Sequence, residues 1–407
     1  MADYDIKLKR DDLVELLTKN EGFSDLLGSV LNQVLEAQMT EHLGAERYEH
    51  TESRSGHRNG TRTRQLYTRV GPVTLQVPQT RDGSFKTDIF KRYQRSEQAF
   101  VLGLMEMYLQ GVSTRKVTKI TEELCGASFS KSTVSELCTG LDARLHAWRT
   151  RPINDKRYPF LIVDALVVDV RRDEAVRSTG VLIAYGVNEN GQREPLDLLV
   201  ADSESEASWK RLFSQLKERG LTSVDFVVSD SHKGLVNALK KQFQGAQWQR
   251  CQVHFMRNIL DSAARHLRKE LASELKLVFQ APNKETARKL AQALIDTYQD
   301  KAPNAMNCLE NGLDGGLSVL QLPERYRKRL RTTNLAERVN EEIRRRERVI
   351  RIFPNEKAAQ RLIGALLADM YEEWQAGIRY FDMSEYWDWK NEQLSQQMNE
   401  NKIVAIS

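Results

Sequence analysis

The sequence contains no apolar run that approaches the eighteen residues of a membrane-spanning helix, so we expect no membrane partner. Cysteine is scarce, with four residues at irregular spacing in 407, which excludes a disulfide scaffold and favours reduced thiols. The first twelve residues, MADYDIKLKRDD, are charged where a signal peptide would be apolar. These absences predict a cytoplasmic protein. Hydrophobic residues make up 40% of the chain, which is enough to build folded cores.

The overall net charge is only +5, but the charge is unevenly distributed along the chain. Residues 1–45 hold four basic and nine acidic residues, whereas residues 54–95 hold ten basic and two acidic ones. Residues 323–352 again favour basic side chains, eleven against five. Two basic blocks in a nearly balanced chain indicate a polyanion that is bound at defined places, although solvated surface is the alternative.

The first fifty residues predict amphipathic helix over 11–43, because leucine and valine recur there at helical spacing. We expect a break near residues 20–24 and a stop at Gly44. Segment 1–50 is a candidate oligomerisation surface, with packing inside the same chain as the alternative.

Residues 51–95 predict a basic arm. The polar stretch 51–64 reads as a loop, and 65–69 with 73–77 reads as a short β-hairpin around Gly71-Pro72. Such an arm can follow a phosphate backbone or enter a groove of DNA. Its candidate DNA contacts are Arg54, Arg58, Arg62, Arg64 and Arg69.

Residues 96–152 have the spacing of a helix-turn-helix. One short helix is expected over 112–124, a turn over 125–127 and a second helix over 130–137, capped by Ser130. An ordinary helical hairpin is the alternative. The candidate DNA contacts of this domain are Arg115, Lys131, Ser132 and Thr133.

From residue 153 the pattern becomes α/β. Strands are expected over 160–170, 180–187, 196–201, 224–229 and 246–250, with helices over 205–219 and 232–243, which describes a mixed five-stranded sheet. Residues 253–331 read as helical throughout. We therefore predict an α/β catalytic domain over 153–252 and 332–378, interrupted by an all-helical insertion over 253–331 and followed by an aromatic tail over 379–407.

Two acidic residues belong to apolar strands of this predicted sheet. Asp164 lies inside FLIVDALVVDV, where a charge is costly unless a metal ion or another group compensates it. Asp230 follows the fourth strand, at the carboxyl edge where α/β sheets bind ligands. A role as a strand-end cap or turn residue is the alternative for each. Asp169 and Asp225 compete with them but lie nearer polar edges.

The third candidate acid is Glu337, on a helix predicted over 334–348. At 100° per residue, Glu337 and its rival Glu341 lie opposite the apolar stripe and share their face with Arg344 and Arg348. An exposed helix laced by ion pairs is the alternative. Two Asp and one Glu would suit phosphodiester chemistry with two Mg²⁺ ions, for which Mn²⁺ can substitute, because these ions prefer oxygen ligands.

Several motifs resemble the Mutator-type transposases of bacterial insertion sequences. They are YPFLIVDA (158–165), VVSDSHKGL (227–235), RCQVHFMRN (250–257) and TTNLAERVNEEIRRRERVIRIFPN (332–355), supported by the SGHRNGTRTR arm, GVSTRKV and SKSTVSEL. The resemblance covers nearly the whole chain. It implies a ribonuclease H-like fold with Asp164, Asp230 and Glu337 as its metal-binding catalytic triad.

The resemblance also implies the function. Such enzymes cut DNA at terminal inverted repeats and transfer the 3′ ends, and bacterial members are thought to use a copy-out, paste-in route through a circular intermediate. Arg338, Arg344, Arg345 and Arg348 are then expected DNA contacts near the cleavage point. Localisation would be the bacterial cytosol, at the nucleoid when bound to DNA.

The Cys-x-x-His motif of Cys251 and His254 belongs to the same resemblance. We expect it to support the catalytic pocket and expect no zinc, because no second Cys/His pair follows at finger-like spacing. Trp248 would pack against the pocket or stack on a base, with an ordinary core position as the alternative. Two other functions stay open: a non-catalytic DNA-binding protein, and a nuclease of the same fold without strand transfer.

Overall fold

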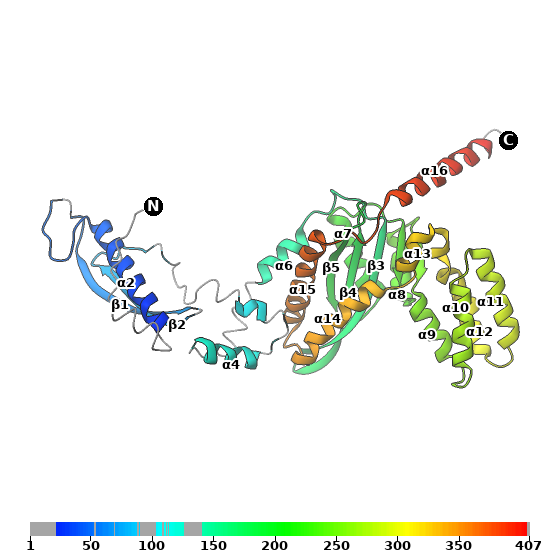
Figure 1. Cartoon of the computed structure of the whole chain (residues 1–407), viewed down its shortest axis with the longest axis horizontal. Coiled ribbons are helices and arrows are strands. Elements are labelled where there is room, and N and C mark those ends of the chain that lie inside the picture. Colours follow the sequence, from blue (N-terminus) through cyan, green and yellow to red (C-terminus); the bar gives the residue numbers. More distant parts are fainter. Residues whose placement is uncertain are drawn as a thin grey trace. The chain divides into compact units, whose positions relative to one another are not determined.

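A computed structural model of the 407-residue chain describes residues 22–52, 54–68, 70–87, 89, 103–107, 110, 112, 114–125 and 141–404 (Figure 1). The chain divides into two compact units, residues 1–140 and 141–407. Each unit is described by itself. Within the described ranges, no helix has both the length and the apolar content that crossing a membrane requires.

The first unit packs one helix on one hairpin. Helix α2 (Gly22–Leu43) covers β1 (Arg58–Thr68) and β2 (Gly71–Thr80). It ends where Gly44 adopts a φ of 64°, so the predicted glycine stop is confirmed. Leu35 of α2 packs against the hairpin, so this side of the helix is buried within its own chain. Residues 11–21 of the predicted helix lie outside the described residues. The core consists of Leu35, Leu66, Val73, Leu75 and Val77.

The hairpin differs from the prediction in its length and in its turn. Strand β1 includes residues 58–64, which we expected to be a loop, because the β-branched Thr61 and Thr63 extend the ladder with β2. The chain reverses between Thr68 and Gly71 rather than at 71–72. The Thr68 hydroxyl donates to the Gly71 carbonyl at 2.8 Å, and Gly71 has a φ of 116° that favours glycine.

The predicted helix-turn-helix is described only in its first half. Helix α4 (Thr114–Cys125) matches the expected helix over 112–124. The expected second helix, with Lys131, Ser132 and Thr133, lies outside the described residues, as do Arg69 and the side chain of Arg115. The helix-turn-helix stays a prediction.

The second unit contains the mixed five-stranded sheet that the sequence predicts. Its strand order is β5-β4-β3-β6-β7. Strand β4 pairs antiparallel with both β3 and β5, whereas β6 pairs parallel with β3 and β7 pairs parallel with β6. The strands are β3 (Phe160–Arg172), β4 (Ala175–Val187), β5 (Arg193–Ala201), β6 (Phe226–Ser229) and β7 (Gln247–Arg250).

Helices cover both faces of this sheet (Figure 1). One face packs its apolar side chains against α7 and α8 to form the main core. The other face is covered by α14 and α15, and α6 packs on α15. The bounds are α6 (Leu141–Thr150), α7 (Glu206–Glu218), α8 (Lys233–Gln242), α14 (Asn334–Ile350) and α15 (Glu356–Ala376).

A block of helices follows β7, as the absence of a strand pattern over 253–331 predicts. The buried side chain of Gln249 in β7 ties this block to the sheet: its amide nitrogen donates to the Gly316 carbonyl at 2.9 Å and its oxygen accepts from the Val319 nitrogen at 2.6 Å. The block contains α9 (Gln252–Asp261), α10 (Arg268–Phe279), α11 (Lys284–Tyr298), α12 (Pro303–Gly316), a 3₁₀ turn (Ser318–Gln321) and α13 (Glu324–Leu330).

The aromatic tail packs within its own chain. Tyr386, in α16 (Ser384–Val404), is 1% exposed, and its ring lies 4.8 Å from that of Phe160 in β3. The Tyr386 hydroxyl donates to Asp225 at 2.7 Å, and the Lys390 ammonium pairs with the same carboxylate at 2.5 Å. These residues of the tail are therefore packed against β3 and the residue that precedes β6.

Candidate active site

Asp164 lies in the middle of β3 on the sheet face that α14 covers. Its neighbour in β4 is Ile183, and the aspartate is 8% exposed. The side-chain amide of Asn340 in α14 donates to Asp164 Oδ2 at 2.8 Å. Burial raises the pKa of Asp164 from 3.8 to about 7, and the nearby charge of Asp230 raises it as well. This is the costly buried acid that the sequence pattern predicts.

Asp230 is the first residue after β6, the strand that pairs in parallel with β3. Its Oδ1 accepts a hydrogen bond from the His232 backbone nitrogen at 3.1 Å, which fixes the turn into α8. Because both strands are parallel neighbours, Asp230 emerges beside Asp164. The effect of its charge on the pKa of Asp164 shows that the two carboxylates are electrostatically coupled.

Glu337 lies in the first turn of α14, one helical turn before Asn340. Its Oε1 is 3.7 Å from Nε2 of His254 in α9. The sulfur of Cys251 and then the charges of Asp164 and Glu337 raise the pKa of His254, against the effect of burial. The structure thus brings residues 164, 230, 254 and 337 into one electrostatic cluster.

The rival acids have other surroundings. Glu341 is exposed on α14, whereas Asp225 is held by Tyr386 and Lys390 as described above. Asp169 accepts a hydrogen bond from the Ser178 hydroxyl at 3.0 Å on a strand edge. Their charges are compensated or solvated, so each has a structural explanation.

Cys251 lies next to this cluster and contacts His254 and Thr333. It is fully buried at the N-terminus of α9, and its sulfur accepts from the backbone nitrogen and the hydroxyl of Thr333, both at 3.4 Å. Although burial opposes it, hydrogen bonding to His254 and Thr333 lowers the pKa of the thiol. Cys251 therefore joins the start of α9 to the residue that precedes α14.

Trp248 packs at the junction of β7 and α12. Its indole nitrogen donates to the Ser229 hydroxyl at 2.8 Å. Its ring lies so close to Gly315 that a Cβ atom at position 315 would come within 2.7 Å of the ring. The close approach explains the need for glycine at 315. Trp248 also packs against the main core of the sheet, which is the ordinary core position considered above.

Sequence reasoning missed three residues around the cluster. Asn340 could have been found, since it lies three residues after Glu337 on a neighbouring part of the helix face. Tyr185 and Glu204 gave no signal. The buried Tyr185 hydroxyl has no hydrogen-bond partner among the described residues, and the charge of Asp164 contributes to its raised pKa. Burial and then the charge of Asp230 raise the pKa of Glu204.

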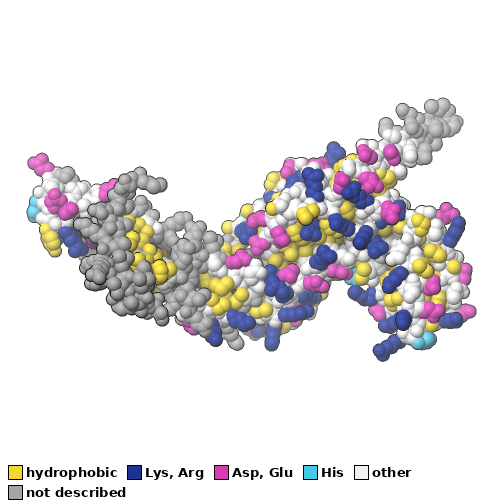
Figure 2. Space-filling view, viewed as in Figure 1, with side chains coloured by type: hydrophobic (Ala, Val, Ile, Leu, Met, Phe, Trp, Pro, Cys, Tyr) yellow, Lys and Arg dark blue, Asp and Glu magenta, His cyan; other side chains and the backbone are white. Residues whose placement is uncertain are grey.

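Basic side chains, interspersed with acidic ones, lie over the region of α14 in the space-filling view (Figure 2). Arg344 pairs with Glu347 at 2.6 Å, and Arg345 pairs with Glu342 at 3.2 Å. Arg338 and Arg348 are exposed. The helix therefore shows both the ion-paired surface and the cationic face that the sequence left as alternatives.

The arginines of the first unit also differ in their surroundings. Arg58 is largely buried, pairs with Glu36 at 2.7 Å and donates to the Thr40 hydroxyl at 2.7 Å. Arg54 donates to the carbonyls of Glu49 and Gly56. Arg62 is exposed, and Arg64 is half-buried. The hairpin arm therefore uses Arg54 and Arg58 for its own packing.

Divalent metal chemistry would need oxygen ligands at this cluster. Asp164 and Asp230 supply carboxylates whose mutual repulsion a cation would relieve. Within the part of the chain that the structure describes, no group of three or more His, Cys, Asp or Glu side chains is close enough to hold one ion together. Asp164 and Asp230 are therefore the neighbouring carboxylates that could contact such an ion.

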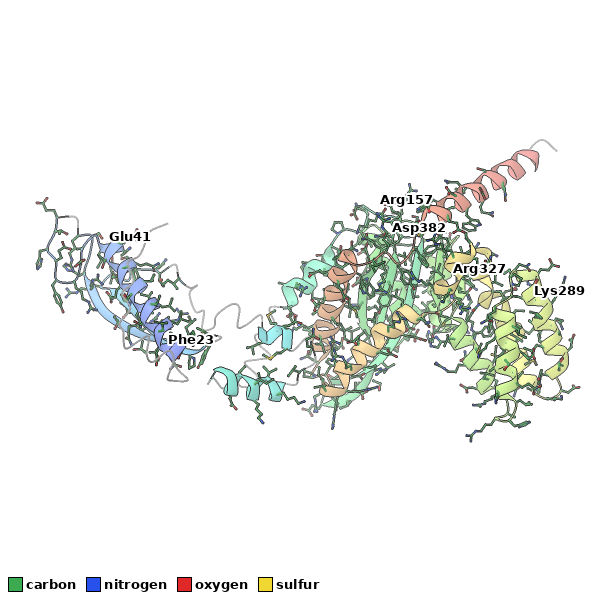
Figure 3. The ribbon with its side chains drawn as sticks, viewed as in Figure 1. Phe23, Glu41, Arg157, Lys289, Arg327 and Asp382 are labelled. Atoms are coloured by element: carbon green, nitrogen blue, oxygen red, sulfur yellow. The ribbon has the colours of Figure 1, made fainter. Side chains whose placement is uncertain are left out.

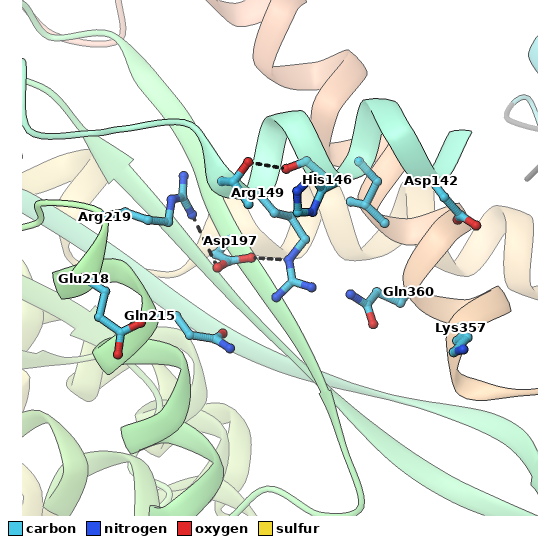
Figure 4. Close-up of a pocket in the computed structure, with 11 residues that line it drawn as sticks. Asp142, His146, Arg149, Asp197, Gln215, Glu218, Arg219, Lys357 and Gln360 are labelled. Atoms are coloured by element: carbon cyan, nitrogen blue, oxygen red, sulfur yellow. Dashed lines mark hydrogen bonds and ion pairs between the residues drawn. The ribbon is translucent and has the colours of Figure 1, made fainter. Parts of the chain in front are cut away.

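A separate cavity of about 650 Å³ lies at the β5 side of the sheet, between α6, α7 and α15 (Figure 4). Asp197 is buried there, and its carboxylate is paired with Arg149 at 2.9 Å and with Arg219 at 3.4 Å. Because the buried charge is compensated from two helices, this cluster links secondary-structure elements. It contains none of the predicted catalytic acids.

Comparison with known proteins agrees with the motifs. The family described as "Transposase, Mutator family" matches residues 3–377. The chain is 42% identical to the transposase for insertion sequence element IS256 in transposon Tn4001 of Staphylococcus aureus, over 92% of this chain and 97% of that one. It is also 42% identical to the transposase for ISRM5 of Rhizobium meliloti, over 94% and 96% of the two chains.

Among solved structures, the Drosophila P element transposase strand transfer complex has a TM-score of 0.30 and 11% identity, over 75% of this chain and 85% of that one. That similarity is too weak to support an argument. The family match and the two relatives span almost the full sequence. The chain therefore belongs to the Mutator family of transposases.

Proposed function

We propose that this transposase binds the terminal inverted repeats of its mobile element, cleaves DNA at the element ends and joins the 3′ ends to target DNA. The carrying observation is the cluster formed by Asp164, Asp230 and Glu337, which come from β3, from the end of β6 and from α14. Asp164 lies in β3, Asp230 follows the parallel neighbour of β3, and Glu337 lies in the first turn of α14, which packs on β3. The family supplies the context in which such a cluster acts on DNA.

The fold we propose for this unit is ribonuclease H-like. Three antiparallel strands followed by two strands parallel to the first, with helices on both faces, support that proposal. The helical block after β7 would be its insertion domain. The first unit, with its basic hairpin and α4, would supply recognition of the repeat.

Asp164, Asp230 and Glu337 would hold the divalent cations. When bound, two Mg²⁺ ions would favour attack by a hydroxyl or water and would stabilise the leaving 3′ oxygen. Asn340 keeps the Asp164 carboxylate oriented toward α14 through its hydrogen bond. His254 has a raised pKa and, when protonated, would place positive charge near Glu337 and Asp164 and limit their repulsion.

The arginines of α14 would hold phosphates of the bound DNA beside the acids. Arg338 and Arg348 are exposed and available for that role, whereas Arg344 and Arg345 would have to exchange a carboxylate partner for a phosphate. Joining two element ends would require at least a dimer on DNA. A copy-out, paste-in route would release a circular intermediate, detectable by amplification across the joined ends.

The direct test uses the purified full chain, Mg²⁺, a labelled terminal-repeat duplex and a target plasmid. The proposal predicts joined products that disappear with Asp164→Asn while repeat binding stays within a few fold. Cleavage without joining would identify a nuclease of the same fold. Binding without cleavage by the unsubstituted protein would identify a non-catalytic DNA-binding protein, and either result would overturn the proposal.

A further inference from the structure

A groove of about 620 Å³ lies in the helical block, between α9, α10 and α13. Its apolar lining is formed by side chains of α9 together with one aromatic ring from α10. Val253 is 38% exposed there. The apolar lining residues are Val253, Met256, Leu260 and Phe279.

The rim of this groove is strongly basic. Arg257, Lys276 and Lys328 are exposed, and none has a carboxylate within ion-pair distance among the residues that the structure describes. Asp261 is the one acidic residue of the described lining, and Arg268 pairs with it at 3.3 Å. Arg331 adds another cation. The groove therefore combines an apolar floor with uncompensated positive charge.

The groove is lined by two elements, α9 and the start of α14, that also carry residues of the proposed active site. Val253 directly precedes His254 on α9, and Asn334, which lines the groove, begins the helix whose first turn carries Glu337. The backbone nitrogen of Gln252 donates to the Arg331 carbonyl at 2.9 Å, which holds the two walls together at this end. The groove therefore lies beside the elements that carry His254 and Glu337.

We propose that this groove binds unpaired nucleotides of the DNA strand next to the cleaved phosphodiester. A double helix presents phosphates on its outside and keeps its bases stacked, so it could use the basic rim but not the apolar floor. Unpaired nucleotides use both, because bases pack on apolar side chains while Arg and Lys contact the backbone. This inference rests on the proposed function for the position of the cleaved bond.

The test measures binding of a labelled 15-nucleotide single strand of mixed sequence, and of the 15-base-pair duplex, to the full chain in EDTA. The triple variant Arg257→Glu, Lys276→Glu, Lys328→Glu is expected to lose about tenfold or more in single-strand affinity. The slope of log affinity against log salt concentration should decrease in magnitude by about 2, because each of the three lost phosphate contacts contributes roughly 0.7 to it. Duplex affinity should fall by a clearly smaller factor than single-strand affinity, because a duplex can use only the rim of the groove.

A matched pair tests the apolar floor. Val253 and Leu290 have nearly equal exposure, 38% and 37%, but Leu290 lies on α11 and does not line the groove. Val253→Ser is expected to weaken single-strand binding about threefold, on the scale of about one buried methylene group, with an unchanged salt slope. Leu290→Ser should have no effect. Lys289→Glu, on the outer edge of α11 (Figure 3), is the corresponding charge control.

Unchanged single-strand affinity in the triple variant would overturn the proposal, as would equal losses for single strand and duplex. So would absent single-strand binding by the unsubstituted protein. The Asp164→Asn variant provides an independent control for single-strand binding. It should bind the single strand normally even if strand transfer is never observed, so failure of the groove and failure of the proposed function give different results.

Discussion

The side-chain amide of Asn340 donates a 2.8 Å hydrogen bond to Oδ2 of Asp164 and joins residues 176 positions apart in sequence. The bond connects α14 to the middle of β3. It fixes how the helix lies on the sheet, so Glu337, one turn earlier, faces His254. The arrangement of the acids therefore depends on a neutral side chain.

Replacing Asn340 tests this dependence. Asn340→Leu keeps the size of the side chain but removes the donor, so Asp164 loses its orientation. We expect strand transfer to fall about 10- to 100-fold, the usual effect of removing a group that orients a metal ligand. Rates of 3′-end joining at fixed Mg²⁺ give the measurement. Glu341→Gln, on the exposed side of the same helix, is the control, and a rate within twofold for Asn340→Leu would refute the prediction.

The raised pKa of Asp164 predicts how stability depends on pH without metal. Because the folded pKa of about 7 lies above the ordinary value of 3.8, the folded chain binds this proton more tightly than the unfolded chain. The free energy of unfolding should therefore fall by about 4 kcal/mol as pH rises from about 4 to about 7. Asp164→Asn should remove most of this loss, and an unchanged pH dependence would contradict the prediction.

Tryptophan fluorescence can follow this unfolding selectively, because all six tryptophans lie between residues 148 and 389, in the second unit. Measurements in EDTA across pH 4–8 keep metal out of the comparison. Two further variants should act in opposite directions on Asp164. Asp230→Asn removes a like charge and should lower its pKa, whereas His254→Gln removes a favourable charge and should raise it.

The hydrogen bonds of Gln249 predict that the stability of the helical block depends on this side chain. Gln249→Leu would leave the Val319 nitrogen unpaired in a buried place, while the Gly316 carbonyl keeps its bond from Gln252 at 2.8 Å. We expect a loss of about 1–3 kcal/mol in unfolding free energy. Gln252→Leu should cost less, since Gln249 would still satisfy Gly316. Urea unfolding of the two variants provides the comparison, and a larger loss for Gln252→Leu would contradict it.

We expect Arg58 and Arg62 of the hairpin to have different roles, one in stability and the other in DNA binding. Arg58 is held by Glu36 and Thr40, so Arg58→Ala should destabilise the first unit by about 1 kcal/mol, seen by circular dichroism on heating. Arg62 is exposed, so Arg62→Ala should leave stability unchanged and reduce the salt slope of duplex binding by about 0.9. Equal effects of the two substitutions on both measurements would refute this division.

Much of the second unit follows from local pattern. The apolar, β-branched run around Asp164 predicts β3, and the change from strands to amphipathic segments after residue 250 predicts the helical block. The acids at 164 and 230 could be selected because a charge within or beside an apolar strand needs compensation. The helix of Glu337 follows from its apolar stripe.

Long-range contacts could not be read from the sequence. The pairing of Asn340 with Asp164 depends on how α14 crosses β3, and the buried hydroxyl of Tyr185 depends on strand register. The hairpin was mispredicted because Gly71-Pro72 resembles a turn, whereas the Thr68 hydroxyl places the reversal two residues earlier. The enclosure of Tyr386 by Phe160 and Asp225 likewise depends on contacts between distant segments.

The choice between the two glutamates of α14 tests the proposed catalytic cluster most directly. Strand transfer would be measured for Glu337→Gln and Glu341→Gln with the same labelled terminal repeat, target DNA and Mg²⁺. Because Glu337 faces His254 and Glu341 is exposed, we predict that only Glu337→Gln abolishes joining while repeat binding persists. Joining by Glu337→Gln at the rate of the unsubstituted protein would contradict the account.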